Sequence, residues 1–268
     1  MKLSISHRTT YRYDAPIRVA VQSLRLTPSV HDGQVILDWD IVVEGGQKGA
    51  GFRDGAGDWI ESWSLRGPAD HVTVAVSGTV ETTDLAGVLR GHREAVNPFV
   101  YLRDTPATRA DAALDALARA VTETEPLARA HALSAAIADA IAYRPGATEA
   151  HTTAAEALAL GEGVCQDHAH ALIGAARTVG LPARYASGYL FATADGSPHE
   201  AAHAWAEIWI YGLGWVGFDP ANRCCPDDRY VRVGSGDDAH DAAPIRGIAR
   251  GLGVERLEVT VAVQQAQQ

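Results

Sequence analysis

The spacing of hydrophobic residues changes along the chain, and this change restricts the folds that the chain can adopt. In the first 84 residues, apolar side chains recur at every second position, most clearly in segments 35–43 and 72–80. A period of two is the spacing of half-buried strands. Turn residues, such as Asp32-Gly33, separate these segments. Short strands with regular turns predict a β-rich, sandwich-like domain.

From Asp104 the chain becomes rich in alanine, and the apolar spacing becomes helical. Segments 114–121 and 133–141 each carry apolar residues at three- and four-residue intervals, as expected for helices that bury one face. Thr153 and Glu156 have the spacing of a capping box. A third helix is therefore predicted to begin at Thr152 or Thr153.

The chain length of 268 residues allows one large domain or two modest ones. We predict a β-rich N-terminal domain over residues 1–84, a connector over residues 85–104 and a core over residues 105–268. Within the core, the acidic stretch between residues 220 and 253 is expected to be irregular. The alternation in residues 257–263 predicts a last strand before a frayed, glutamine-rich tail.

The segment GEGVCQDHAH places Cys165 at the start of a further predicted helix, which Gly180-Leu181-Pro182 ends. Backbone N–H groups and the helix dipole stabilise a thiolate at a helix N-terminus. The same N–H groups can bind an oxyanion. Cys165 is therefore a candidate nucleophile, although a cysteine at this point is also compatible with simple packing.

Two later strands supply candidate partners for this thiol. The alternation from residue 203 onwards puts His203, Trp205, Glu207 and Trp209 on one face and apolar residues on the other. Asp219 ends the next strand, which is predicted to form a hairpin with the first. We expect His203 to take the proton of Cys165. Asp219 is expected to accept the Nδ1–H of His203 and so orient the ring.

These segments resemble a known family. GEGVCQDHAHALIGAARTVGLPARYASGYL, HAWAEIWI and GWVGFDPAN are similar to the core of the bacterial transglutaminase-like superfamily. LSISHRTTYRYDAPI with LRLTP resembles the β-rich N-terminal region that accompanies this core in bacteria, and DDAHDAAPIRG resembles its C-terminal part. The resemblance covers nearly the whole chain.

The resemblance implies an α+β protein with a papain-like core, in which a helix bearing the cysteine packs on an antiparallel sheet bearing the histidine and the aspartate. By motif position the implied catalytic triad is Cys165, His203 and Asp219. The family acts on amide bonds through a thioester. Release of the acyl group by water gives a cysteine peptidase or amidase, which is the expected activity here, with a peptide or protein as substrate. Release by an amine gives transglutaminase-type acyl transfer, and a non-catalytic peptide-binding module is a second alternative.

Other histidines and cysteines of the chain are of types that bind metals or react as thiols. Cys165, His168 and His170 include zinc-ligand types, but no second spaced pair accompanies them. We therefore expect no metal and no cofactor, and assign the two histidines to packing or to the helix surface. Cys224 and Cys225 are expected to be reduced thiols without a catalytic role.

Two aromatic residues are candidates for binding the substrate. Trp205 shares its predicted face with His203, and Tyr189 lies on the neighbouring predicted strand. Large aromatic side chains more often belong to a core than to a cleft. The prediction that these two line the cleft therefore rests on their placement beside the histidine.

The charge balance of the chain bears on its partners. With 23 Lys and Arg against 33 Asp and Glu, the formal net charge is −10, which disfavours nucleic acids and anionic membrane surfaces. The first residues lack the apolar core of a signal peptide, and no apolar run reaches the roughly 18 residues that span a bilayer. We therefore expect a cytoplasmic protein. The sequence leaves the oligomeric state open.

Overall fold

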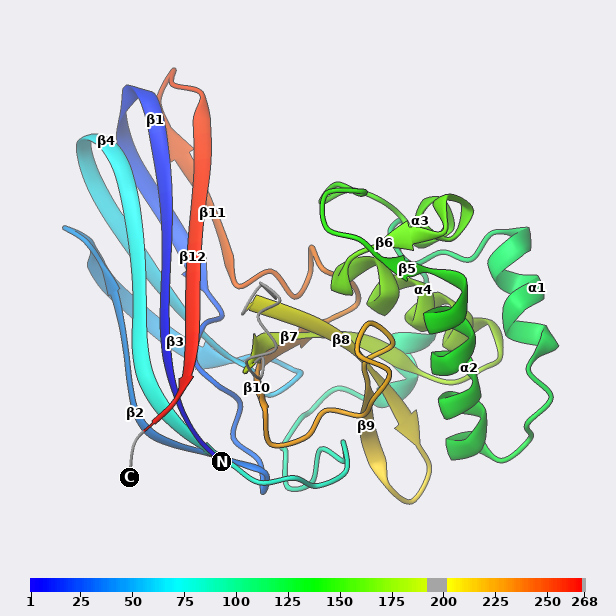
Figure 1. The fold of residues 1–268 in the computed structure, drawn as a ribbon. Coiled ribbons are helices and arrows are strands. Elements are labelled where there is room, and N and C mark those ends of the chain that lie inside the picture. The colour runs from blue at the N-terminus through cyan, green and yellow to red at the C-terminus, as the bar shows by residue number, and fades with distance from the viewer. Residues whose placement is uncertain (192–201, 267–268) are drawn as a thin grey trace.

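The computed structural model describes residues 1–191 and 202–266. A long sheet forms one side of the molecule and the helices form the other (Figure 1). Within the described ranges, no helix is long and apolar enough to cross a membrane. The elements in chain order are β1 (Lys2–Leu24), β2 (Gln34–Val43), β3 (Gln47–Arg53), β4 (Trp59–Thr82), the 3-10 helix η1 (Pro98–Leu102), α1 (Ala112–Ala120), α2 (Pro126–Ala140), β5 (Ala142–Tyr143), α3 (Ala154–Leu160), β6 (Glu162–Gly163), α4 (Cys165–Thr178), β7 (Ala183–Leu190), β8 (Ala202–Ile210), β9 (Gly214–Phe218), β10 (Tyr230–Gly236), β11 (Ile245–Arg250) and β12 (Glu255–Gln265).

The long strands β1 and β4 form the centre of a six-stranded antiparallel sheet. β2 and β3 pair with opposite halves of β4, and β12 and β11 pair with opposite halves of β1. The register of β1 against β4 shifts between Arg12 and Ile17, and such irregularities bend a sheet. Side chains from both halves, including Ile17, Leu24 and Val74, share one core. The β-rich character predicted for the N-terminal region is confirmed.

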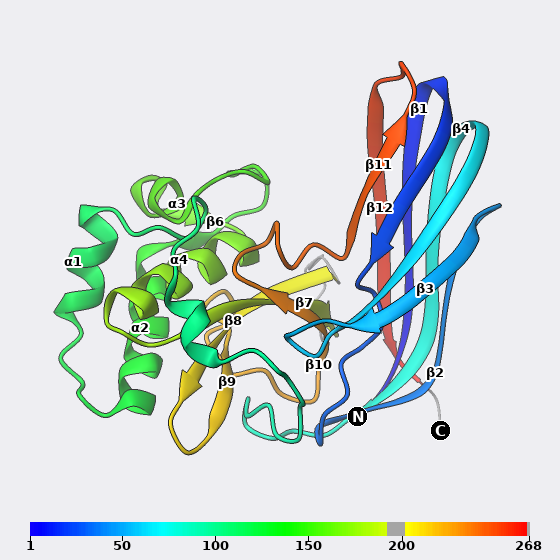
Figure 2. The same cartoon turned by 180° about the vertical axis from the view of Figure 1, so that it is seen from behind.

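The strands β11 and β12 lie late in the chain but belong to this N-terminal sheet. β12 pairs with the first half of β1, for example Leu257 with Tyr11, and Figure 2 shows both late strands beside β1. The segment 257–263, predicted as part of the core, is thus an edge strand of the other sheet. The prediction of irregular chain over 220–253 was wrong, because this stretch contains β10 and β11.

The second sheet is antiparallel and has the strand order β10-β7-β8-β9. The helix α4 packs against β8 and β7. The alternation predicted for β8 is confirmed, since its small and aliphatic side chains share one core with α4: Ala204, Ala206, Ile208, Ile210, Leu172, Ile173 and Ala176. This helix-on-sheet arrangement is the one implied for a papain-like core.

Two sets of contacts join the long sheet to the core. Leu3 of β1 packs in a small apolar cluster with Val231 of β10. The buried guanidinium of Arg232 binds Glu207 at 2.7 Å and Asp58, in the β3–β4 turn, at 2.9 Å. Buried charges are tolerated only when they are paired and hydrogen-bonded. This cluster therefore ties the β3–β4 turn to β10 in one arrangement.

Candidate active site

Cys165 is the first residue of α4, and local interactions fix where this helix begins. The preceding helix α3 ends at Gly161, whose φ of 70° lies in the left-handed region that favours glycine. Val164 is extended, and its N–H donates to the Asp167 carboxylate at 2.8 Å. The Thr148 hydroxyl donates to the same carboxylate at 2.6 Å. The Cys165 N–H, in the first turn, has no acceptor within the helix and is available to an oxyanion.

The structure brings the three predicted triad residues together. His203, near the start of β8, is hydrogen-bonded to the Cys165 thiol and donates from Nε2 to Asp219 Oδ2 at 2.6 Å. Both His203 and Asp219 are buried. The expectation that Asp219 accepts from Nδ1 was wrong. Because Nε2 faces the carboxylate, Nδ1 is the nitrogen left for the thiol.

Two residues that the sequence did not single out complete the surroundings of Asp219. The Asn222 side-chain N–H donates to Asp219 Oδ2 at 2.7 Å, and the Tyr230 hydroxyl donates to the same oxygen at 2.8 Å. Asn222 was detectable as the last residue of the GFDPAN motif, three positions after the aspartate. Tyr230 lies on β10, a strand that the sequence did not predict, and no motif marked this tyrosine.

These contacts set the charges of the pair. Burial alone would lower the pKa of His203, but the hydrogen bonds and charges of Asp219 and the Cys165 thiol outweigh it and raise the pKa to about 10. Burial opposes ionisation of Asp219, yet hydrogen bonds from His203, Asn222 and Tyr230 hold its pKa below the usual value. An imidazolium between a carboxylate and a thiol is the arrangement that favours a thiolate.

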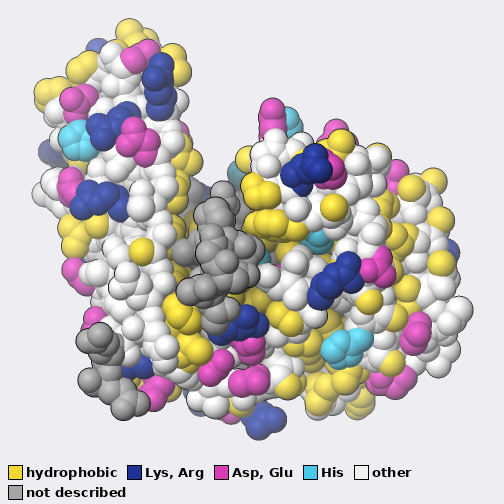
Figure 3. Space-filling view, viewed as in Figure 1, with side chains coloured by type: hydrophobic (Ala, Val, Ile, Leu, Met, Phe, Trp, Pro, Cys, Tyr) yellow, Lys and Arg dark blue, Asp and Glu magenta, His cyan; other side chains and the backbone are white. Residues whose placement is uncertain are grey.

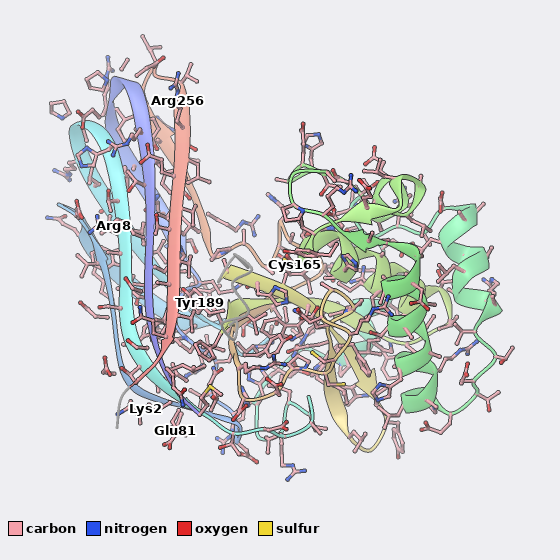
Figure 4. The ribbon with its side chains drawn as sticks, viewed as in Figure 1. Lys2, Arg8, Glu81, Cys165, Tyr189 and Arg256 are labelled. Carbon is pink, nitrogen blue, oxygen red and sulfur yellow. The ribbon has the colours of Figure 1, made fainter. Side chains whose placement is uncertain are left out.

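The two predicted substrate-binding residues occupy different places. Trp205 is buried and stacks on the His203 ring, with ring centroids 6.5 Å apart. It does not line the cavity beside Cys165, so its prediction as a cleft residue is not supported by its position. Tyr189 does line this cavity, and its hydroxyl is 2.9 Å from Nδ1 of His7. In Figure 4, Cys165 and Tyr189 lie between the long sheet and the helices.

An open cavity of about 250 Å³ adjoins the thiol. Three hydroxyl side chains of β7 line it: Tyr185, Ser187 and Tyr189. Those of Ser187 and Tyr189 are hydrogen-bonded, whereas the Tyr185 hydroxyl has no hydrogen bond to another described residue. Burial and the nearby Cys165 raise the pKa of Tyr185 well above its usual value. Its hydroxyl therefore remains a hydrogen-bond donor at neutral pH.

The other histidines of α4 are committed to the interior. Both ring nitrogens of His168 lie 2.9 Å from backbone carbonyl oxygens, those of Val164 and Ile141. His170 accepts from the Ala239 N–H at 3.0 Å, and burial lowers its pKa to about 4. Over residues 1–191 and 202–266, no group of three or more His, Cys, Asp or Glu side chains is arranged to hold a metal ion.

The remaining cysteines differ in their distance from the triad. Both Cys224 and Cys225 are free thiols. The Cys224 sulfur lies 3.3 Å from the Tyr230 hydroxyl oxygen, and through that tyrosine it adjoins Asp219. Burial raises the pKa of Cys225 to about 11. Neither thiol has an imidazole partner comparable to that of Cys165 in the described part of the chain.

Comparison with known proteins defines the class of this site. Residues 115–220 match the family described as the transglutaminase-like superfamily, and residues 3–81 match the bacterial transglutaminase-like N-terminal region. An uncharacterized protein of Mycobacterium leprae is 30% identical over 280 residues, which cover 98% of each chain. The chain therefore belongs to the transglutaminase-like superfamily.

Two further relatives extend the comparison. An uncharacterized protein of Mycobacterium tuberculosis is 29% identical over 272 residues, covering 91% of this chain and 86% of its own. The crystal structure of "a Putative Cysteine Protease from Cytophaga hutchinsonii" superposes with a TM-score of 0.73 at 22% identity, covering 100% of this chain and 92% of that chain. The latter likeness establishes a shared fold. Family and geometry together support a cysteine-dependent enzyme.

Proposed function

We propose that the chain is a cysteine peptidase or amidase that hydrolyses amide bonds in a peptide or protein through a thioester. One observation carries this proposal: Cys165, at a helix N-terminus, is hydrogen-bonded to the His203 imidazole. The other side of that ring is held by the buried Asp219 carboxylate, with Nε2 of His203 2.6 Å from Oδ2 of Asp219. The printed name of the Cytophaga hutchinsonii structure is consistent with it.

The proposed reaction has two halves. The Cys165 thiolate attacks the carbonyl carbon, and the Cys165 N–H stabilises the oxyanion. The C–N bond then breaks, the leaving amine takes a proton from the His203 imidazolium, and a thioester remains. Neutral His203 next takes a proton from water, whose oxygen attacks the thioester. The C–S bond breaks, which releases the carboxylic acid and restores the thiolate beside the imidazolium.

Alkylation with limiting iodoacetamide across pH tests the first element of this mechanism, the activated thiol. Peptide mass spectrometry then locates the label. We expect selective labelling of Cys165 at mildly acidic pH, and loss of that selectivity in His203→Ala. Cys225→Ala is the matched control and keeps the labelling of Cys165. Equal labelling of the three cysteines in the folded wild type contradicts the proposal.

A substrate screen tests the reaction itself. Cys165→Ala is expected to abolish cleavage of peptide substrates while the thermal unfolding temperature changes little. Adding a primary amine separates the two fates of the thioester, since hydrolysis yields a free acid and acyl transfer yields a new amide. Formation of the amide as the main product at low amine concentration would favour transglutaminase-type transfer over the proposed hydrolysis.

A further inference from the structure

The wall of the cavity beside Cys165 is largely apolar. Leu26, Val164, Val233 and Pro244 contribute to it, and no Asp, Glu, Lys or Arg is among the described residues that line it. Figure 3 shows hydrophobic side chains gathered on both sides of the junction between the long sheet and the helical part. A ligand group that enters this cavity therefore meets few partners for a charge.

The ionisable groups of the wall do not change this picture. The reacting pair, Cys165 and His203, carries opposite charges when ionised. Burial lowers the pKa of His7 to about 4, so this ring is neutral at pH 7. Its two nitrogens lie 2.9 Å from the Tyr189 hydroxyl and 2.8 Å from the Thr9 hydroxyl. Among the described residues, a carboxylate or an ammonium group placed in the cavity would therefore find an ionic partner only by competing with the Cys165–His203 pair, and it would lose water on entering.

Part of this wall comes from the N-terminal sheet. His7 lies on β1, and Leu26 follows the end of β1. Leu26 is fully buried at the junction, and Val233 of β10 belongs to the apolar cluster that joins the sheet to the core. Because the ion pair between Arg232 and Asp58 also fixes this junction, the sheet presents its part of the wall in a fixed position.

We propose that this cavity binds an uncharged, largely apolar side chain of the substrate next to the reacting carbonyl, and that the N-terminal sheet takes part in selecting it. The inference rests on the proposed function, since it assumes that Cys165 is the reacting group. The size is suitable, because a cavity of about 150 Å³ lined by apolar side chains holds benzene and this one measures about 250 Å³. An aromatic ring or a branched aliphatic group fits such a space.

The test compares three reagents that alkylate the same thiol: iodoacetamide, its N-benzyl derivative and its N-(para-carboxybenzyl) derivative. Rates at Cys165 are measured by mass spectrometry and divided by the rates with glutathione, which removes the intrinsic reactivity of each reagent. We expect the benzyl group to accelerate labelling of Cys165 by about tenfold or more. The ring carboxylate is expected to abolish that advantage.

Substitutions then locate the effect. Ala202 lines the cavity and is exposed, so Ala202→Asp adds a carboxylate there without disturbing a core. It is expected to reduce the benzyl preference severalfold, whereas Ala113→Asp, an exposed site on α1 with the same change of charge, leaves it unchanged. Leu26→Ala is expected to weaken the preference, and Leu24→Ala, an equal truncation in the sheet core, is its control. The Ala202 pair decides the matter if the leucine variants do not fold.

The outcomes separate this inference from the proposed function. Equal benzyl and parent rates at Cys165, relative to glutathione, contradict the apolar site even when Cys165 shows the expected reactivity at acidic pH. A benzyl preference that Ala202→Asp leaves intact also contradicts it. A preference that persists while Cys165 lacks its reactivity at acidic pH supports the apolar site and contradicts the proposed catalytic thiol.

Discussion

Replacing Asp219 with asparagine tests the charge arrangement around His203, because the change removes one negative charge and preserves the shape of the side chain. The contact at stake joins His203 Nε2 to Asp219 Oδ2 at 2.6 Å. A hydrogen bond between charged groups contributes about 1.5–3 kcal/mol. At about 1.4 kcal/mol per pKa unit, its loss lowers the pKa of His203 by about one to two pH units. The starting value is about 10.

The direction of the effect follows from the role of the proton. In the proposed mechanism, His203 must be an imidazolium to protonate the leaving amine, so activity is expected to decline as the pH rises through its pKa. In Asp219→Asn this alkaline decline is expected to begin about one to two pH units earlier. The contribution of the charged His203 ring to the free energy of unfolding also depends on the pH. It is fully present below the unfolded-state value of 6.5 and is lost as the pH rises through about 10.

An NMR titration of ring-labelled histidine measures the pKa of His203 directly and needs no substrate. Tyr230→Phe is the matched control, since it removes one hydrogen bond to the same carboxylate but keeps the negative charge. Its titration is expected to shift less than that of Asp219→Asn. An unchanged His203 titration in Asp219→Asn would refute the reasoning, because the carboxylate would then not be what keeps the ring charged.

Further expectations concern catalysis and stability. Tyr185→Phe is expected to lower kcat by about a hundredfold with little change in the labelling of Cys165. We propose its hydroxyl as the second oxyanion donor, because it lines the cavity beside Cys165 and has no hydrogen bond to another described residue. Equal kcat values would contradict this. Glu207→Gln removes the carboxylate shared by buried Arg184 and Arg232. In urea unfolding it is expected to lower the free energy of unfolding by about 3 kcal/mol. The control Glu44→Gln lies in an exposed pair and is expected to lower it by at most about 1 kcal/mol. Burial lowers the pKa of three histidines to about 4, so between pH 6.5 and 4 the unfolded chain binds more protons than the folded chain. The thermal unfolding temperature is therefore expected to fall as the pH is lowered from 6.5 to 4. An unfolding temperature that does not change over this range would contradict this. These histidines are His7, His31 and His170.

Features set by neighbouring residues were predictable from the sequence. The Thr153 and Glu156 capping box forms as expected, with the Thr153 N–H donating to Glu156 at 2.9 Å. The helix that begins at Cys165 and the inner face of β8 also follow the predicted pattern. In each case a period or a cap within a few residues determines the local conformation. The hairpin of β8 and β9 then brings His203 near Asp219.

Features that depend on distant parts of the chain were not predictable in the same way. β10 carries a buried arginine, Arg232, and therefore lacks the apolar alternation of an ordinary strand. It is stabilised by Asp58 and Glu207, which lie far away in the sequence. The choice of Nε2 of His203 as the donor to Asp219 depends on the ring orientation within the folded site. No local pattern in the sequence encodes either property.

The pairing of β12 with β1 has a consequence for the order in which the protein can mature. On the ribosome, the first strand emerges before the whole transglutaminase-like core, whereas its partner over residues 255–265 is made after that core. Until then, the outer edge of β1 from Leu3 to Tyr13 lacks that partner. That stretch includes His7, which lines the cavity beside Cys165. A nascent chain whose core has already been synthesised therefore still lacks one of the two strands that flank His7, since β4 supplies Val76 on one side and β12 supplies Val261 on the other.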